Sequence, residues 1–75
     1  MKQHPSKEKT LKPHGLPHLR ILRQRKGLSI GQLASMTGIR RDTIAHFESG
    51  REDPQPYQLR LLARILEVPQ YVLVS

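Results

Sequence analysis

Apolar residues recur every three or four positions from about residue 16 onward, which is the spacing of helices with one buried face. The first such segment is predicted to run from about Pro17 to Lys26, because proline suits a first helical turn and Gly27 can end a helix. Leu19 and Leu22 lie on its apolar face. No alternation typical of a strand appears before the last five residues, so the predicted fold class is all-α.

The second helix has the clearest start signal in the chain. Ser29 and Gln32 have the spacing of a capping box, in which each side chain accepts a hydrogen bond from the other residue's backbone N–H. Leu28 and Leu33 flank them as a hydrophobic staple. We expect this helix to end one or two residues before Gly38, because glycine tolerates the left-handed conformation that follows many helices.

Three further helices complete the pattern. One is predicted from Arg40 or Arg41 to Glu48, and the next from about Pro56 to Glu67. A last short turn starts at residue 69. The residues expected to face inward on these helices are Ile44, Phe47, Leu59, Leu62, Ala63 and Leu66.

The start of the chain has a different composition. Residues 1–15 contain four lysines, one glutamate, two prolines and only two large apolar residues. Such a segment cannot bury enough surface to offset the entropy lost on ordering. We therefore expect a flexible basic tail over residues 1–15 and one folded domain over residues 16–75.

Charge narrows the class of partner. The 75 residues carry a formal net charge of +7 and no cysteine. A small cationic surface attracts polyanions such as nucleic acids, although ribosomal and membrane-surface proteins share this property. The absence of cysteine excludes disulfides, thiolate zinc sites and cysteine nucleophiles. His14 and His18 have the spacing of a metal pair, but Pro17 lies between them and no third ligand is evident.

Other classes of protein find little support in the sequence. It contains no paired carboxylates, no nucleophile with an adjacent base and no glycine-rich phosphate loop, so we expect neither an enzyme nor a cofactor. No apolar stretch reaches the length of a membrane span, and the polar, proline-broken start is not a secretory signal. We expect a cytoplasmic protein, associated with the nucleoid if the chain is bacterial.

The second and third predicted helices together have the pattern of a helix-turn-helix. Ala34 is the small residue that two steeply crossing helices need at their contact, Gly38 allows the sharp turn, and Ile44 fills the angle from the other helix. In such a motif the second helix enters the major groove of DNA, led by its N-terminal residues.

Around this motif the chain resembles the Cro/C1-type (Xre-family) helix-turn-helix domain of phage repressors and many bacterial regulators. The resemblance covers about residues 18–73 without a gap. It implies a five-helix, lambda-repressor-like fold that binds double-stranded DNA. It further implies a transcription regulator, more often a repressor, which reads a short inverted repeat as a homodimer. The matching positions are Leu19, Leu22, Arg23, Lys26, Gly27, Leu28, Ser29, Leu33, Ala34, Gly38, Ile39, Ile44, Glu48, Gly50, Pro54, Leu59, Leu62, Ala63, Leu66 and Val68.

The resemblance also implies roles for individual residues. Arg23 and Glu48 correspond to a buried ion pair between the first helix and the end of the third. The alternative is an exposed pair, which would contribute under about 1 kcal/mol. A second set of positions faces base edges or lies close by, and the alternative role of each is a solvated polar side chain. This set is Arg41, Asp42 and His46, then Arg40 and Thr43.

Phosphate contacts and departures from the family pattern complete this interpretation. Arg51 and Ser29 are candidate phosphate contacts, Ser29 because a helix N-terminus favours anions. Ile30 stands where the family often has glutamine, and it either packs or touches a thymine methyl group. Arg40 replaces the usual serine or threonine cap, a loss of about 1 kcal/mol. Glu52 and Asp53 also place negative charge near the expected contact of Arg51 with the DNA backbone.

These departures keep a second hypothesis open. The chain could be an adaptor or antitoxin-like protein that retains the fold and binds a protein, such as a toxin, with DNA bound only weakly and without sequence preference. The apolar end, residues 71–75, and the outer side of Ile21 are candidate surfaces for self-association. The basic tail is either a solvated extension or an arm that follows phosphates or enters the minor groove.

Overall fold

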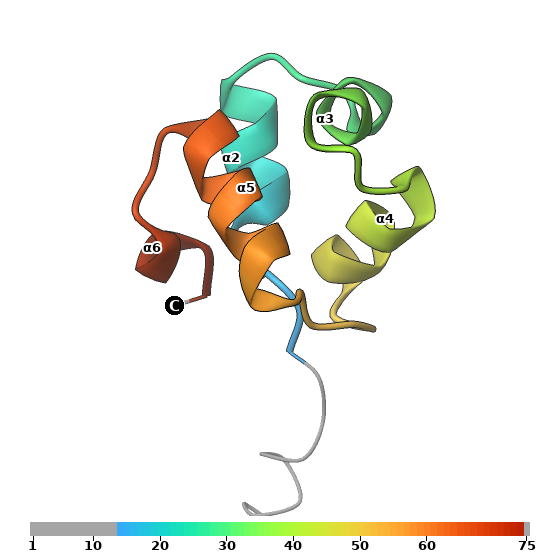
Figure 1. Ribbon diagram of the computed structural model, residues 1–75, viewed down its shortest axis with the longest axis vertical. Coiled ribbons are helices and arrows are strands. Elements are labelled where there is room, and N and C mark those ends of the chain that lie inside the picture. Colours follow the sequence, from blue (N-terminus) through green and yellow to red (C-terminus); the bar gives the residue numbers. More distant parts are fainter. Residues whose placement is uncertain (1–13, 75) are drawn as a thin grey trace, which may run out of the picture.

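The computed structural model describes residues 14–74, and the regular structure of those residues is entirely helical. The helices are α2 (Leu19–Arg25), α3 (Ile30–Thr37), α4 (Arg41–Ser49), α5 (Pro56–Leu66) and α6 (Gln70–Val74). α5 packs against α3 and α6, while α4 packs against α3 and α2 (Figure 1). The expected all-α, five-helix class is confirmed. No helix over residues 14–74 has the length and apolar character needed to cross a membrane.

Every one of these helices contributes to a single apolar core. Complete burial of an aliphatic or aromatic side chain contributes about 1.5–3 kcal/mol, so this core is the main source of stability in so small a fold. The predicted inward-facing residues belong to it except Leu22 and Leu59, which pack against it partly buried. The core residues are Leu16, Leu19, Leu33, Ile39, Ile44, Phe47, Leu62, Ala63, Leu66 and Leu73.

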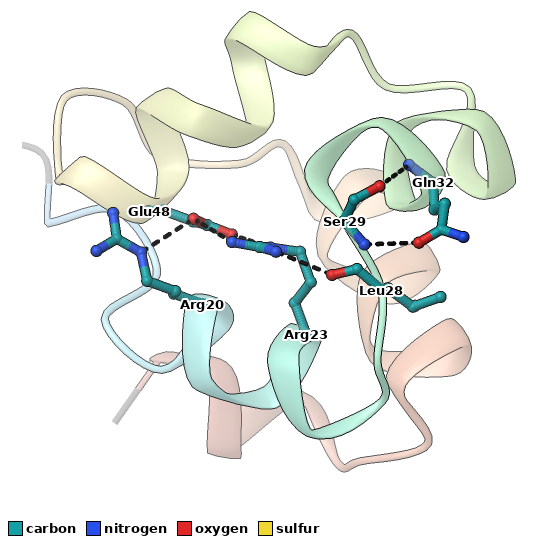
Figure 2. A network of polar contacts seen from close by, with 6 residues as sticks. All are labelled: Arg20, Arg23, Leu28, Ser29, Gln32 and Glu48. Carbon is teal, nitrogen blue, oxygen red and sulfur yellow. Dashed lines mark hydrogen bonds and ion pairs between the residues drawn. The ribbon is translucent and has the colours of Figure 1, made fainter.

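The predicted start and end of the second helix are confirmed. Ser29 Oγ accepts the Gln32 backbone N–H at 3.0 Å, and the Ser29 N–H donates to Gln32 Oε1 at 2.8 Å (Figure 2). α3 ends at Thr37 and is followed by Gly38, whose φ of 77° is left-handed and whose N–H donates to the Ala34 carbonyl at 2.8 Å. Short-range hydrogen bonds therefore fix both ends of α3.

Several helix ends differ from the prediction by one or two residues, and two of these differences have a local explanation. α2 begins at Leu19 rather than at Pro17, because residues 17 and 18 form a turn in which the Leu19 N–H donates to the Leu16 carbonyl at 3.1 Å. α5 ends at Leu66, and Glu67 adopts a left-handed conformation with φ 59°. This conformation costs a non-glycine residue about 1–2 kcal/mol. The Glu67 carboxylate accepts a hydrogen bond from Lys26.

The N-terminal boundary of the folded unit also differs. Residues 1–13 of the expected tail lie outside the described residues. The His14 and Gly15 N–H groups, however, donate to Asp53 Oδ1 at 2.9 and 2.8 Å. A Cβ atom on Gly15 would clash with the carbonyl oxygen of Phe47, and the Leu16 N–H donates to that oxygen at 2.8 Å. The assignment of residues 14 and 15 to the tail was therefore wrong, because their anchor lies 38 or more residues away.

Candidate nucleic-acid interface

The turn between α3 and α4 is held by side chains as well as by glycine. Ile39 is 6% exposed and inserts into the core directly after Gly38. Thr37 Oγ1 accepts the Ile39 N–H at 3.2 Å and donates to the Leu33 carbonyl at 2.8 Å. Thr37 was not identified from the sequence, although a threonine directly before a glycine stop is a local signal for such a bond. The turn therefore sets the direction in which α4 leaves α3.

The first turn of α4 presents polar side chains to solvent. Arg40, Arg41 and Asp42 are exposed, and Thr43 is half-buried. Arg40 is the N-cap residue, with an extended backbone and no capping bond from its side chain. Within residues 14–74, no hydrogen bond or ion pair engages any of these four side chains. Four of the five residues expected near base edges therefore lie together at one end of the helix, with their polar groups free.

The fifth of those residues, His46, lies one turn further along α4 and already has a neighbour. Its Nδ1 is 3.4 Å from Glu52 Oε1, and the two side chains are 44% and 47% exposed. An exposed pair of this kind contributes at most about 1 kcal/mol, and only while the histidine is protonated. The structure therefore places beside His46 an acidic partner that was not predicted from the sequence.

The candidate phosphate contacts lie at different helix ends. The Arg51 side chain is exposed and has no partner among residues 14–74, while its backbone N–H donates to the His46 carbonyl at 2.9 Å. Ser29 is exposed as well, but its hydroxyl already accepts the Gln32 N–H. The capping role of Ser29 is thus present in the free protein. A contact from its hydroxyl to phosphate would be additional to that role.

At the opposite end of α4, two arginines of α2 bind the carboxylate of Glu48. Arg23 Nε donates to Oε2 at 2.7 Å and Nη2 to Oε1 at 3.1 Å, while Arg20 Nε donates to Oε1 at 3.3 Å (Figure 2). The Glu48 side chain is 1% exposed, that of Arg23 10% and that of Arg20 62%. The structure brings Arg23 and Glu48 together in a buried, bidentate pair and adds Arg20 at its edge.

Arg23 also fixes the start of α3. Its Nη1 donates to the Leu28 carbonyl at 2.9 Å, directly before the Ser29 cap (Figure 2). The hydrogen bond to Glu48 raises the pKa of Arg23 above its ordinary value, so this guanidinium stays charged. One side chain therefore ties α2 to both helices of the helix-turn-helix. Removing one member of a buried pair leaves the other charge unpaired, at a cost of about 3–5 kcal/mol.

The departures from the family pattern have local explanations. Ile30 is half-buried and packs against the core, which is one of the two roles expected for it. Glu52 lies beside His46, and Asp53 holds the amides of residues 14 and 15. Two acidic residues that were expected to lie near bound phosphate thus have partners within the domain.

Sequence comparison identifies relatives over almost all of the described residues. A family model described as a helix-turn-helix domain matches residues 18–73. RghRB, an uncharacterized HTH-type transcriptional regulator of Bacillus subtilis (strain 168), is 42% identical over 52 residues. The match covers 68% of this chain and 37% of RghRB, so the chain spans well under half the length of that relative.

Solved structures share the arrangement of helices. The restriction-modification controller protein C.AhdI from Aeromonas hydrophila has a TM-score of 0.71 and 32% identity, over 76% of this chain and 86% of that one. The biofilm regulator SinR, solved in complex with DNA, has a TM-score of 0.74 over 79% and 95% of the two chains, and its 22% identity supports the fold alone. An HTH_3 family transcriptional regulator from Vibrio cholerae has a TM-score of 0.67 and 28% identity, over 75% of this chain and 32% of that one.

Proposed function

The chain belongs to the helix-turn-helix family, as a domain of the Xre/Cro type, and from this premise we propose that it is a sequence-specific DNA-binding transcription regulator. In this proposal α4 lies in the major groove with its N-terminal end leading. The observation that carries the proposal is the contrast within α4, whose first turn has free polar groups while its last turn is fixed to α2.

Each of the five candidate base-reading side chains has a chemical role in this proposal. Arg41 donates to both acceptors of a guanine, which supplies about 1–3 kcal/mol of discrimination between bases. Asp42 accepts from a cytosine amino group or orients Arg41, and His46 exchanges Glu52 for a base or a phosphate. Arg40 and Thr43 lie close enough along the helix to contribute.

The phosphate contacts and the assembly follow from the same placement. Arg51 and the start of α3 at Ser29 contact the DNA backbone on either side of α4. Two copies of the chain bind half-sites one helical turn apart, about 34 Å, as an inverted repeat. We further propose that binding represses transcription and that the protein acts at the nucleoid in the cytoplasm.

The adaptor hypothesis is the weaker alternative. It was motivated by Ile30, Arg40 and the two acidic residues after Arg51. Packing of Ile30 and the intramolecular partners of Glu52 and Asp53 now account for three of these four departures. They therefore give no reason to expect a loss of base reading.

The test is selection from a randomised pool of duplex DNA by the purified protein at about 150 mM salt, where weak non-specific binding is suppressed. We expect enrichment of an inverted repeat. Enrichment of a single half-site would contradict the dimer. Binding that appears only at low salt and has no preferred sequence would contradict the regulator and favour a protein-binding adaptor, with a toxin among the partners to be tried.

A further inference from the structure

Gly31, in the first turn of α3, is the one glycine of the chain whose backbone conformation does not require glycine. The four others adopt positive φ, whereas Gly31 does not. Glycine is less favourable than alanine inside a helix, because it loses more conformational freedom on folding. Its neighbours Ser29, Ile30 and Gln32 cap the helix or pack against the core, so Gly31 is the residue of this turn that has no such role. Another contact must account for it.

That contact is the side chain of Arg41. A Cβ atom built on Gly31 would lie 3.4 Å from Arg41 Nε and 3.6 Å from both Cζ and Nη2. These are the three atoms nearest to that position, and all of them belong to one guanidinium group. The guanidinium therefore lies over the bare first turn of α3, and no other atom outside that turn approaches the Cβ position of Gly31 as closely.

We propose that Gly31 is a positioning residue for Arg41, and that the open surface it leaves selects the side-chain conformation from which Arg41 reads DNA. The inference rests on the proposed function. Arg41 has no hydrogen bond or ion pair among residues 14–74, and its guanidinium lies within van der Waals distance of the Cβ position of Gly31. A side chain ordered before binding loses less conformational entropy when it meets a base.

The size of the side chain at position 31 separates an effect on helix stability from an effect on the position of Arg41. Gly31→Ala adds a Cβ at ordinary van der Waals distance, so it favours the helix and leaves Arg41 in place. Gly31→Val also favours the helix over glycine, but its branched Cβ carries two methyl groups that occupy two of the three staggered directions. We expect both variants to have a thermal midpoint at or above that of the native chain, and only the valine to displace Arg41.

The experiment measures base discrimination with the selected duplex and with duplexes substituted at the position that depends on Arg41. Gly31→Ala keeps the native preference within about twofold. Gly31→Val lowers it by about fivefold or more, the lower limit of what a bidentate arginine supplies. When Arg41→Ala is already present, adding Gly31→Val causes no further loss of base discrimination. That last comparison shows that residue 31 acts through Arg41 and not by obstructing DNA.

Failure of the inference differs from failure of the proposed function. If Arg41→Ala relaxes the preference but Gly31→Val does not, the inference is overturned and the regulator stands. The inference is also overturned if Gly31→Val melts below the native chain, because residue 31 would then contact more than Arg41. If the native chain selects no sequence, the proposed function fails, and the specificity role of Gly31 fails with it.

The contact itself is tested without DNA. In the free protein we expect a nuclear Overhauser effect between the α-protons of Gly31 and the δ-protons of Arg41. Its absence would overturn the proposed positioning even if the regulator is correct.

Discussion

The two ends of α4 differ in burial, in bonding and in charge. At the C-terminal end, Phe47 is fully buried and Glu48 binds two arginines of α2. At the N-terminal end, Arg40 and Arg41 are exposed, and no side-chain bond caps the helix. In the proposed function, anchoring and recognition are thus carried by different residues of one helix. On this proposal, the residues that face DNA can change without weakening the attachment of the helix to the core.

Glu48→Ala should have the largest effect, because it leaves the Arg23 guanidinium buried and unpaired. We expect the free energy of unfolding to fall by about 3–5 kcal/mol, measured by urea titration. Arg20→Ala is the matched control at the exposed edge of the same network, with an expected loss under about 1 kcal/mol. Equal effects of the two substitutions would show that the anchored end does not depend on the buried pair.

Arg41→Ala should have the opposite result, a loss of base discrimination with little loss of stability. We expect base discrimination at one position to fall by about 1–3 kcal/mol, measured by competition between duplexes, with the thermal midpoint nearly unchanged. Arg64→Ala, an exposed arginine on α5, is the control and should leave discrimination as it is. A clear loss of stability in Arg41→Ala would mean that the open end of α4 is structural.

Asp53→Ala should loosen the segment that packs on the anchored end. Loss of the acceptor for the His14 and Gly15 amides is expected to cost about 1 kcal/mol and to speed hydrogen exchange at Gly15. Glu52→Ala removes the adjacent charge and leaves those bonds intact, so Gly15 should exchange at the native rate. Unchanged exchange in Asp53→Ala would contradict the anchoring role.

Arg40→Ser should stabilise the open end by supplying the missing cap. The gain expected for a serine at this position is about 0.5–1 kcal/mol, seen as a higher thermal midpoint. The Glu48 network should be unaffected, so the gain should appear equally in an Arg20→Ala background. No gain in either background would mean that the first turn of α4 is already satisfied in another way.

Glu67→Gln should have the smallest effect on stability. Glu67 follows α5 and so lies outside both ends of α4. The hydrogen bond from Lys26 lowers the pKa of Glu67. The Lys26–Glu67 pair therefore stabilises the fold fully at a pH above the ordinary pKa of a glutamate, and this stabilisation is lost as the pH falls through the lowered pKa. We expect the thermal midpoint of the Glu67→Gln variant to be slightly lower than that of the native chain at neutral pH, and the two midpoints to be equal in acid. A difference that persists in acid would contradict this ion pair as its cause.

The parts of the fold that were predictable are those specified by neighbours in sequence. Ser29 and Gln32 are three residues apart, and Gly38 directly follows the helix that it ends, so local chemistry identifies both ends of α3. The apolar spacing of α5 likewise identified Leu62, Ala63 and Leu66 as core residues.

Distant contacts were not predictable in the same way. Asp53 was interpreted only as a negative charge near the expected contact with the DNA backbone, because nothing near it in sequence shows that its carboxylate accepts from residues 14 and 15. The contact of Gly31 with Arg41 requires the crossing angle of two helices, which periodicity does not supply. Only the family resemblance indicated that Arg23 and Glu48 correspond to a buried pair.

The most direct test of the division within α4 is a titration of isotope-labelled native protein with its selected duplex at about 150 mM salt, followed by NMR. We predict that the largest shifts of backbone amides fall in the first turn of α4, at Arg40, Arg41 and Asp42, and at the start of α3. Shifts that gather instead on the outer face of α5, at Tyr57, Arg60 and Arg64, with the first turn of α4 unchanged, would contradict this division.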